Sequence, residues 1–338
     1  HRDLHSFPTR RSSDLLKSGF PLFLCQKCDT EYNLSDRHLF PGRRRNLFEG
    51  SLRMFSLCPD DIGVLLTYRC VSECAHCLYN CGPRHTAVMT TDTLREALEA
   101  LAVYPQRPQV HLTGGEPFLY YPLLLDGVRM AAERGIWVYV ETSAAWCTDE
   151  EEAAIRFAEL REAGLQSVLI SCSPFHAVRI PPERTLCAIR AAQQVLGADR
   201  VMVYQRAFMD LMRRFGETRP TPLVRYEETY GLDGAKRLLW DGYGIIPGGR
   251  AGYRLGYLVR HEPPEAFADQ DCAWPLLYAQ HSHMDLHGNF IPAFCGGLVV
   301  GDWHQLPQLL AEFQGAHYPP LIALLAERGP YGLFGMAQ

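Results

Sequence analysis

The stretch Ile62-Gly-Val-Leu-Leu-Thr-Tyr68, followed directly by Arg69-Cys70-Val-Ser-Glu-Cys74-Ala-His-Cys77, is the starting point for predicting how this chain folds. Its first half is a short run of β-branched and apolar residues, which predicts a strand. Its second half carries three cysteines at the spacing C-x3-C-x2-C, which predicts a polar loop. A strand that ends in a loop of reactive side chains is the first unit of a pattern that continues along the chain.

That pattern is a repeat of about 30 residues, the usual length of a βα unit. Strands are expected over 62–68, 109–113, 136–141, 167–171 and 200–204, and helices over 91–101, 123–134, 149–163 and 182–196. Parallel strands joined by helices predict an α/β fold whose sheet is closed or half-closed into a TIM-like barrel. Beyond about residue 205 the pattern weakens at Pro- and Gly-rich breaks.

The three cysteines follow the first predicted strand, at the end of a barrel where active-site loops lie. Cys70, Cys74 and Cys77 could bind three irons of a 4Fe–4S cluster and leave the fourth iron open. An open metal position is a binding site for a further ligand.

The second predicted strand ends in Thr113-Gly114-Gly115-Glu116-Pro117. The glycines allow the backbone to approach a ligand closely, and Glu116 is an acceptor for an ammonium group. The loop after the first strand therefore carries candidate metal ligands, and the loop after the second carries a candidate acceptor for an ammonium group.

The cysteine spacing, with His76 directly before the last cysteine, and the Gly-Gly-Glu-Pro loop together resemble the radical S-adenosylmethionine superfamily. The resemblance implies a partial (β/α)6 barrel in which the open iron binds S-adenosylmethionine and Gly114, Gly115, Glu116 and Pro117 hold its methionine moiety. It also implies reductive cleavage to a 5′-deoxyadenosyl radical and an external electron donor such as ferredoxin or flavodoxin. No particular substrate follows from these motifs.

Polar residues after the next strands are candidates for the same cofactor, in the place where the family binds its ribose and carboxylate. Helix capping is the structural alternative for the Ser and Thr candidates, and a solvated helix start is the alternative for Gln205 and Arg206. His176 is a candidate acid or base, although a hydrogen bond that anchors its loop is the favoured explanation. The remaining candidates are Thr142, Ser143, Ser171, Ser173, Gln205 and Arg206.

Cys81 leaves a second interpretation open. It extends the run to C-x3-C-x2-C-x3-C, which is close to ferredoxin spacing and would suit a four-cysteine electron carrier. A zinc-stabilised binding module is the other non-enzyme alternative, because Cys25-Gln-Lys-Cys28 is half of a zinc site.

Towards the C-terminus, residues 283–295 predict a hairpin with a Gly288-Asn289 turn, between Cys272 and Cys295. This region resembles, in reduced form, the SPASM or twitch extensions that hold auxiliary clusters in peptide-modifying members, which favours a peptide substrate and makes Cys272 and Cys295 a possible second metal site. His281, His283 and His287 could join a metal.

Gly248, Gly249 and Arg250 could bind an anion. The remaining cysteines are expected to be small buried side chains; they are Cys58, Cys147, Cys172 and Cys187.

Composition agrees with a folded enzyme and excludes several other classes. The chain has 338 residues, 12 of them cysteines, with 47% hydrophobic and 21% charged residues and a net charge of −5. An acidic net charge gives no basic field for nucleic acid or anionic membrane, and no apolar run is long enough to span one. The cytoplasm is the expected compartment, and there thiols stay reduced, so clustered cysteines indicate metal binding or catalysis more often than disulfides.

We expect the barrel over residues 58–251, an N-terminal extension over 16–57 and a C-terminal extension with hairpin and helices over 252–338. Residues 1–15, HRDLHSFPTRRSSDL, resemble translated sequencing-adapter sequence and are excluded from the predicted fold.

Overall fold

The computed structural model describes residues 60–104, 107–259, 261–277, 281–292 and 295–336, all within a compact unit that spans Leu52–Gln338. The predictions for residues 1–15, for the extension over 16–57 and for Cys25, Cys28 and Cys58 lie outside the described residues.

The described strands form one sheet in the order β5-β4-β3-β2-β1-β6-β7-β8. Strands β1 to β6 pair with one another in parallel, whereas β7 pairs antiparallel with both β6 and β8. The five strands predicted from the repeat are confirmed, and the α/β class with a parallel sheet is confirmed with them. The bounds are β1 Asp61–Leu65, β2 Gln109–Thr113, β3 Val138–Thr142, β4 Ser167–Ser171, β5 Val201–Tyr204, β6 His281–Asp285, β7 Asn289–Pro292 and β8 Gly301–Asp302.

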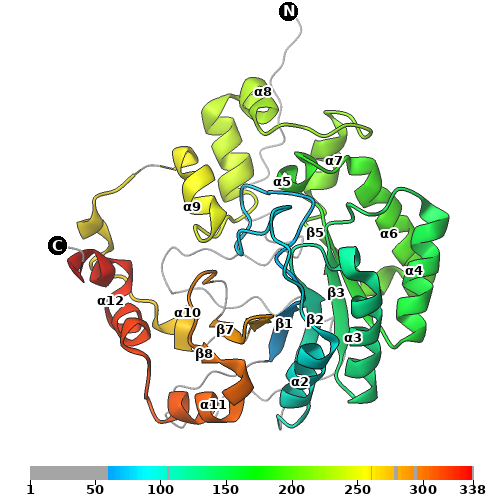
Figure 1. The fold of residues 1–338 in the computed structure, drawn as a ribbon. Coiled ribbons are helices and arrows are strands. Elements are labelled where there is room, and N and C mark those ends of the chain that lie inside the picture. The colour runs from blue at the N-terminus through cyan, green and yellow to red at the C-terminus, as the bar shows by residue number, and fades with distance from the viewer. Residues whose placement is uncertain (1–59, 105–106, 260, 278–280, 293–294, 337–338) are drawn as a thin grey trace, which may run out of the picture. The chain divides into compact units, whose positions relative to one another are not determined.

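Four helices connect the first five strands and lie along the outside of the sheet (Figure 1). All four were predicted, with bounds that differ by up to two residues, and in the structure they are α2 Thr91–Ala102, α3 Tyr121–Glu133, α4 Glu150–Glu162 and α6 Pro182–Leu196. Their starts follow local chemistry, since Thr90 caps α2 and Asp149 caps α4 by accepting backbone N–H bonds. The further helices are α5 Pro174–Ala177, α7 Phe208–Arg213, α8 Val224–Ala235, α9 Arg250–Arg254, α10 Ala273–Leu277, α11 Leu306–Gln314 and α12 Pro320–Met336, the last with a kink at Gly329.

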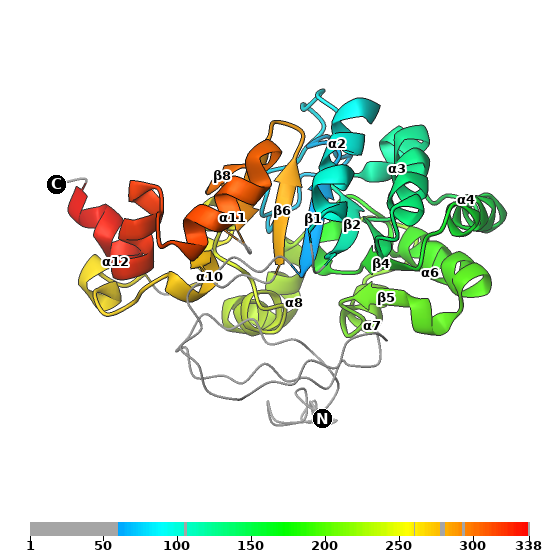
Figure 2. The same cartoon turned by 90° about the horizontal axis from the view of Figure 1, so that it is seen from below.

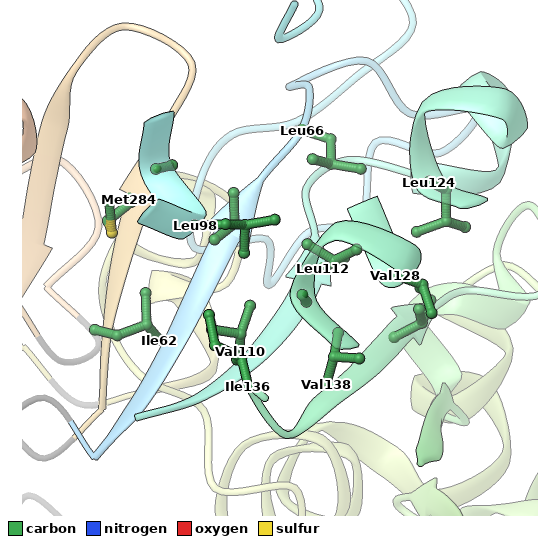
Figure 3. Packing of buried hydrophobic residues seen from close by; sticks show 14 of the residues in the cluster. Ile62, Leu66, Leu98, Val110, Leu112, Leu124, Val128, Ile136, Val138 and Met284 are labelled. Atoms are coloured by element: carbon green, nitrogen blue, oxygen red, sulfur yellow. The ribbon is translucent and has the colours of Figure 1, made fainter. Parts of the chain in front are cut away.

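Alternation along the strands separates an apolar face from a polar one. Ile62, Val110, Leu112 and Val138 are buried beneath side chains of α2 and α3, such as Leu98 (Figure 3). Because successive side chains of a strand point to opposite faces, the residues between them point the other way. The opposite face therefore carries Asp61, Gly63, His111, Thr113, Tyr139, Glu141, His281, His283 and Asp285.

Strand β6 lies beside β1, although most of the described chain separates them in sequence (Figure 2). It belongs to the hairpin expected near the C-terminus, and that hairpin is present as β6 and β7. The sixth parallel strand therefore comes from the region predicted to be an extension, and it extends the sheet on the β1 side instead of following β5.

Within the part of the chain that the structure describes, no helix combines the length and apolar character required to cross a membrane.

Candidate functional site

The cysteine loop follows β1 and is closed on itself by backbone hydrogen bonds. The N–H of Cys70 donates to the carbonyl of Gly82 at 3.1 Å, and the N–H of Gly82 donates to the carbonyl of Tyr68 at 3.1 Å. Cys70 and Cys74 are buried, and Cys77 is half-buried. These bonds hold the three predicted ligands on a short closed loop.

The three thiols are close enough to influence one another electrostatically. Burial raises the pKa of Cys74, and the neighbouring Cys77 and Cys70 thiolates raise it further. Burial raises the pKa of Cys70 to about 12, and the carboxylate of Glu116 contributes to that rise. The loop thus collects thiols whose negative charges would be stabilised by a bound cation.

The Gly-Gly-Glu-Pro loop lies directly against the cysteine loop. The N–H of Gly115 donates to the carbonyl of Thr67 at 2.7 Å, and the N–H of Glu116 donates to the carbonyl of Arg69 at 2.9 Å. A Cβ on Gly115 would lie 2.0 Å from the Arg69 carbonyl oxygen, so only glycine permits this approach. The two motifs that were predicted separately are therefore in contact, and the glycines meet protein backbone.

Glu116 is fully buried and its carboxylate binds the loop that follows β3. Oε1 accepts from the Thr142 hydroxyl at 2.8 Å, and Oε2 accepts from the Ser143 N–H at 3.0 Å and from the Ser143 hydroxyl. Burial raises the pKa of Glu116, while these hydrogen bonds oppose the rise. The carboxylate joins the ends of β2 and β3, a role that the sequence alone did not indicate.

The loop after β4 is anchored by hydrogen bonds between its own residues. Such bonds were the structural alternative to a role in cofactor binding or acid–base chemistry. The N–H of His176 donates to the Ser173 hydroxyl at 3.4 Å, and His176 Nδ1 lies 2.8 Å from that hydroxyl. Burial lowers the pKa of His176 to about 4. Ser171 is buried at the end of β4.

His76 lies in a cluster of rings beside the cysteine loop. Its ring centroid is 4.6 Å from Phe175, 5.0 Å from His176 and 5.0 Å from Tyr243. Burial lowers the pKa of His76, which favours the neutral form of the ring. Its Nδ1 is buried without a hydrogen-bond partner among the described residues, which makes it a polar atom for which a ligand could provide the partner.

Arg250 binds the cysteine loop through both its side chain and its backbone. Its guanidinium donates to the carbonyls of Cys74 at 2.8 Å and Cys81 at 2.6 Å and to Asn80 Oδ1 at 3.0 Å. Its backbone N–H donates to the Cys77 carbonyl at 2.9 Å. The Gly248-Gly249-Arg250 turn was considered above as an anion site. In the structure the Arg250 guanidinium instead binds carbonyl oxygens of the cysteine loop.

Cys81 lies next to Cys77. The backbone N–H of Cys81 donates to the Cys77 sulfur at 3.3 Å, and the Cys81 thiol lowers the pKa of Cys77 by hydrogen bonding to it. The structure therefore brings a fourth thiol to the loop, as the electron-carrier alternative requires.

Other predicted residues lie apart from this loop or serve packing. Gln205 donates to the Tyr243 carbonyl at 2.8 Å, and Arg206 is exposed. Cys172 is fully buried, and the Cys147 and Cys187 sulfurs lie 3.0 Å apart in the core. These three cysteines behave as small core side chains.

The C-terminal candidates divide into two sets. Cys272 and Cys295 are half-buried at the two ends of the segment that contains the hairpin. His281 and His283 converge with His111 of β2, whereas the exposed His287 stacks on Tyr68 instead. The structure thus brings two of the three histidines considered from sequence together with His111 and places His287 elsewhere, and their binding of a metal stays a prediction.

Several residues at the site were not singled out from sequence, among them Asn80, Tyr79 and His111. Asn80 and Tyr79 lie between Cys77 and Cys81, so their proximity to the cysteines was visible. The polar-apolar alternation of Gln109-Val-His-Leu-Thr113 places His111 on the polar face of β2, and this was the available signal.

One protein-family model matches part of the described chain. Residues 64–194 match the family model of the Radical SAM superfamily, and they contain both motifs. No curated protein matches the chain. This match identifies residues 64–194 as a radical SAM domain, and such a domain indicates an enzyme.

Solved structures resemble the chain at low sequence identity. BtrN in complex with AdoMet and 2-DOIA has 15% identity and a TM-score of 0.44, covering 83% of this chain and 91% of its own. A tagged form of anSMEcpe with bound AdoMet has 12% identity and a TM-score of 0.47, covering 78% and 83%. Streptococcus suis SuiB bound to precursor peptide SuiA has 10% identity and a TM-score of 0.38, covering 86% and 76%.

Proposed function

We propose that this chain is a radical S-adenosylmethionine enzyme in which Cys70, Cys74 and Cys77 bind a 4Fe–4S cluster. The observation that carries the proposal is the contact between the two motifs, in which Glu116 N–H donates to the Arg69 carbonyl and Gly115 lies against the start of the cysteine loop. If the two loops did not pack against each other, a side chain at position 115 would not clash with the Arg69 carbonyl.

The residues present fit such a cluster. Three thiols on one closed loop provide soft sulfur ligands, and Arg250 holds the carbonyls of this loop without occupying the thiols. When bound, a reduced cluster would supply the electron that cleaves S-adenosylmethionine to methionine and a 5′-deoxyadenosyl radical, which abstracts hydrogen from substrate.

The residues around the loop would bind S-adenosylmethionine. We assign this role to Gly114, Gly115, Glu116 and Pro117, to His76 with its buried Nδ1, and to the polar residues after β3 and β4. Glu116 would act through a carboxylate that is already fixed by Thr142 and Ser143. The remaining residues assigned here are Thr142, Ser143, Ser171 and Ser173.

An external one-electron donor of the ferredoxin or flavodoxin type would complete the reaction. We propose a peptide substrate, supported by the hairpin of β6 and β7 between Cys272 and Cys295; a small molecule is the alternative. Cys272 and Cys295 are proposed as ligands of a second metal site. A short precursor-peptide gene next to the gene for this chain would favour the peptide, and a neighbouring set of small-molecule biosynthetic genes would favour the alternative.

The test is anaerobic reconstitution with iron and sulfide, followed by reduction in the presence of S-adenosylmethionine. We expect 5′-deoxyadenosine from the wild type and none from Cys77→Ala. Intact cluster absorption without 5′-deoxyadenosine would contradict the proposal.

The position of Cys81 supports one other function, a four-thiolate electron carrier. Cys81→Ala separates the two, because a three-cysteine enzyme keeps its iron and its spectroscopic response to S-adenosylmethionine. A carrier would lose its cluster in the same variant.

A further inference from the structure

A cluster of three histidines lies on the polar inner face of the sheet, formed by strands that are distant in sequence. His111 comes from β2, and His281 and His283 come from β6, with β1 between these two strands. One ligand atom from each imidazole lies within 4.8 Å of the others. His111 and His283 are buried, and His281 is half-buried. Three imidazoles that converge in this way are a donor set for a single metal ion.

Asp61 orients two of the three rings. His111 Nδ1 lies 3.2 Å from Asp61 Oδ1, and His281 Nδ1 lies 3.0 Å from Asp61 Oδ2. The hydroxyl of Tyr139 donates to Asp61 Oδ2 at 3.1 Å. A carboxylate that accepts from Nδ1–H sets the tautomer in which Nε2 carries the lone pair, which is how metal-binding histidines are commonly held.

Tyr79 contacts the third ring. Its hydroxyl lies 2.6 Å from His283 Nδ1 and could donate to it or accept from it. Each of the three Nδ1 atoms thus lies beside an oxygen, and metal binding through Nε2 would keep these contacts.

Gly63 makes the convergence of the rings possible. It pairs in register with His111 on one side and with His283 on the other. A Cβ at this position would lie 2.5 Å from His111 Nε2 and 2.3 Å from His283 Cδ2. Any other residue in the middle of β1 would push the two rings apart.

We propose that His111, His281 and His283 bind one divalent zinc-type ion, with an open fourth position, separately from the cysteine loop. Three imidazoles and a free position are the ligand pattern of zinc sites that bind water or substrate. Because Zn–N bonds of about 2.0–2.1 Å separate tetrahedral nitrogens by about 3.3 Å, binding draws the three rings closer together.

The test uses the full chain with its iron–sulfur site reconstituted, incubated with zinc sulfate and freed of unbound metal. Zinc content and X-ray absorption at the zinc edge are then measured. We expect one additional zinc per chain with nitrogen ligands at about 2.0–2.1 Å, distinguished from the Zn–S distance of about 2.3 Å that cysteine ligands give. Wild-type protein that retains no zinc, or retains it with sulfur ligands alone, overturns the proposal whatever any variant does.

Variants locate the site. His111→Gln and His283→Gln should each lower zinc affinity at least tenfold, and Asp61→Asn should lower it by about 10- to 100-fold while the ligand atoms stay nitrogen. His261→Gln is the matched control, since His261 is exposed and its Nε2 lies 3.2 Å from the carbonyl of the nearby Gly256, away from the three histidines. Unchanged zinc content and imidazole scattering in folded His111→Gln would show that the cluster is a hydrogen-bond network only, and would overturn the proposal.

Discussion

Gly115 allows the close contact between the two loops because glycine has no side chain. Its backbone donates to Thr67, and the atom that a Cβ would meet first is the carbonyl oxygen of Arg69. Neither backbone can move without displacing the cysteine loop, because the loop is closed by its own hydrogen bonds. The glycine therefore determines whether the two motifs can meet.

Gly115→Ala is expected to destabilise the fold by about 1–3 kcal/mol, the usual range for overpacking, and to lower the iron content after reconstitution. Urea denaturation and iron analysis measure the two effects. Gly256→Ala is the matched control, since a Cβ there meets nothing within 4 Å. Equal iron content in the two variants would show that the loops do not depend on the close approach.

His176 is the residue at this site whose protonation should couple to stability. Its pKa in the folded chain is about 4, below the ordinary value of 6.5, because it is buried. As the pH falls from about 6.5 to about 4, the unfolded chain binds a proton that the folded chain does not, so the free energy of unfolding decreases.

We expect His176→Gln to reduce this pH dependence, so that the variant loses less stability than the wild type as the pH falls from about 6.5 to about 4. Denaturant unfolding at a series of pH values measures it. His76 titrates in the same direction, so some dependence remains in the variant. Parallel stability curves for the two proteins across the window would contradict the assignment.

At the scale of elements, the cysteine loop is held by pieces of chain from three places. The β2 loop contacts its start, α9 begins with Arg250 bound to its later half, and Tyr79 reaches β6 through His283. The loop is thus an element whose shape is imposed by its neighbours, because it contains no helix or strand of its own.

Arg250→Lys tests the contribution of α9. Lysine keeps the charge but cannot reproduce the planar fork that binds two carbonyls and Asn80, so buried carbonyls would lose their partners at a cost of about 1–3 kcal/mol each. Reconstituted iron content and stability to urea should both decrease. Arg254→Lys, on the exposed side of the same helix, is the control and should match the wild type.

At the scale of the whole described unit, the sheet depends on residues beyond the predicted barrel boundary. Strand β6 pairs with β1 along five residues, and Met284, Phe290 and Trp303 belong to the same apolar cluster as Ile62. The central strand β1 therefore needs a C-terminal segment for one of its two hydrogen-bonded edges.

A chain ending at residue 251 is expected to lose cooperative unfolding, since β1 would expose an unpaired edge and the core would lose those buried side chains. A chain covering 52–338 is the control and should unfold cooperatively. Denaturation followed by circular dichroism and tryptophan fluorescence distinguishes them, and a single sharp transition in the shorter chain would show that residues 58–251 fold alone.

The sequence by itself determined the repeating strands and helices, the cysteine loop and the Gly-Gly-Glu-Pro loop, because hydrophobic period, capping residues and short spacings are local properties. It also contained the alternation that puts His111 on the polar face of β2. Only the tertiary structure decided that β6 lies beside β1, that Arg250 binds the cysteine loop and that His111 meets His281 and His283. These contacts join residues far apart in sequence, and such pairing depends on which distant edges and faces bury surface together.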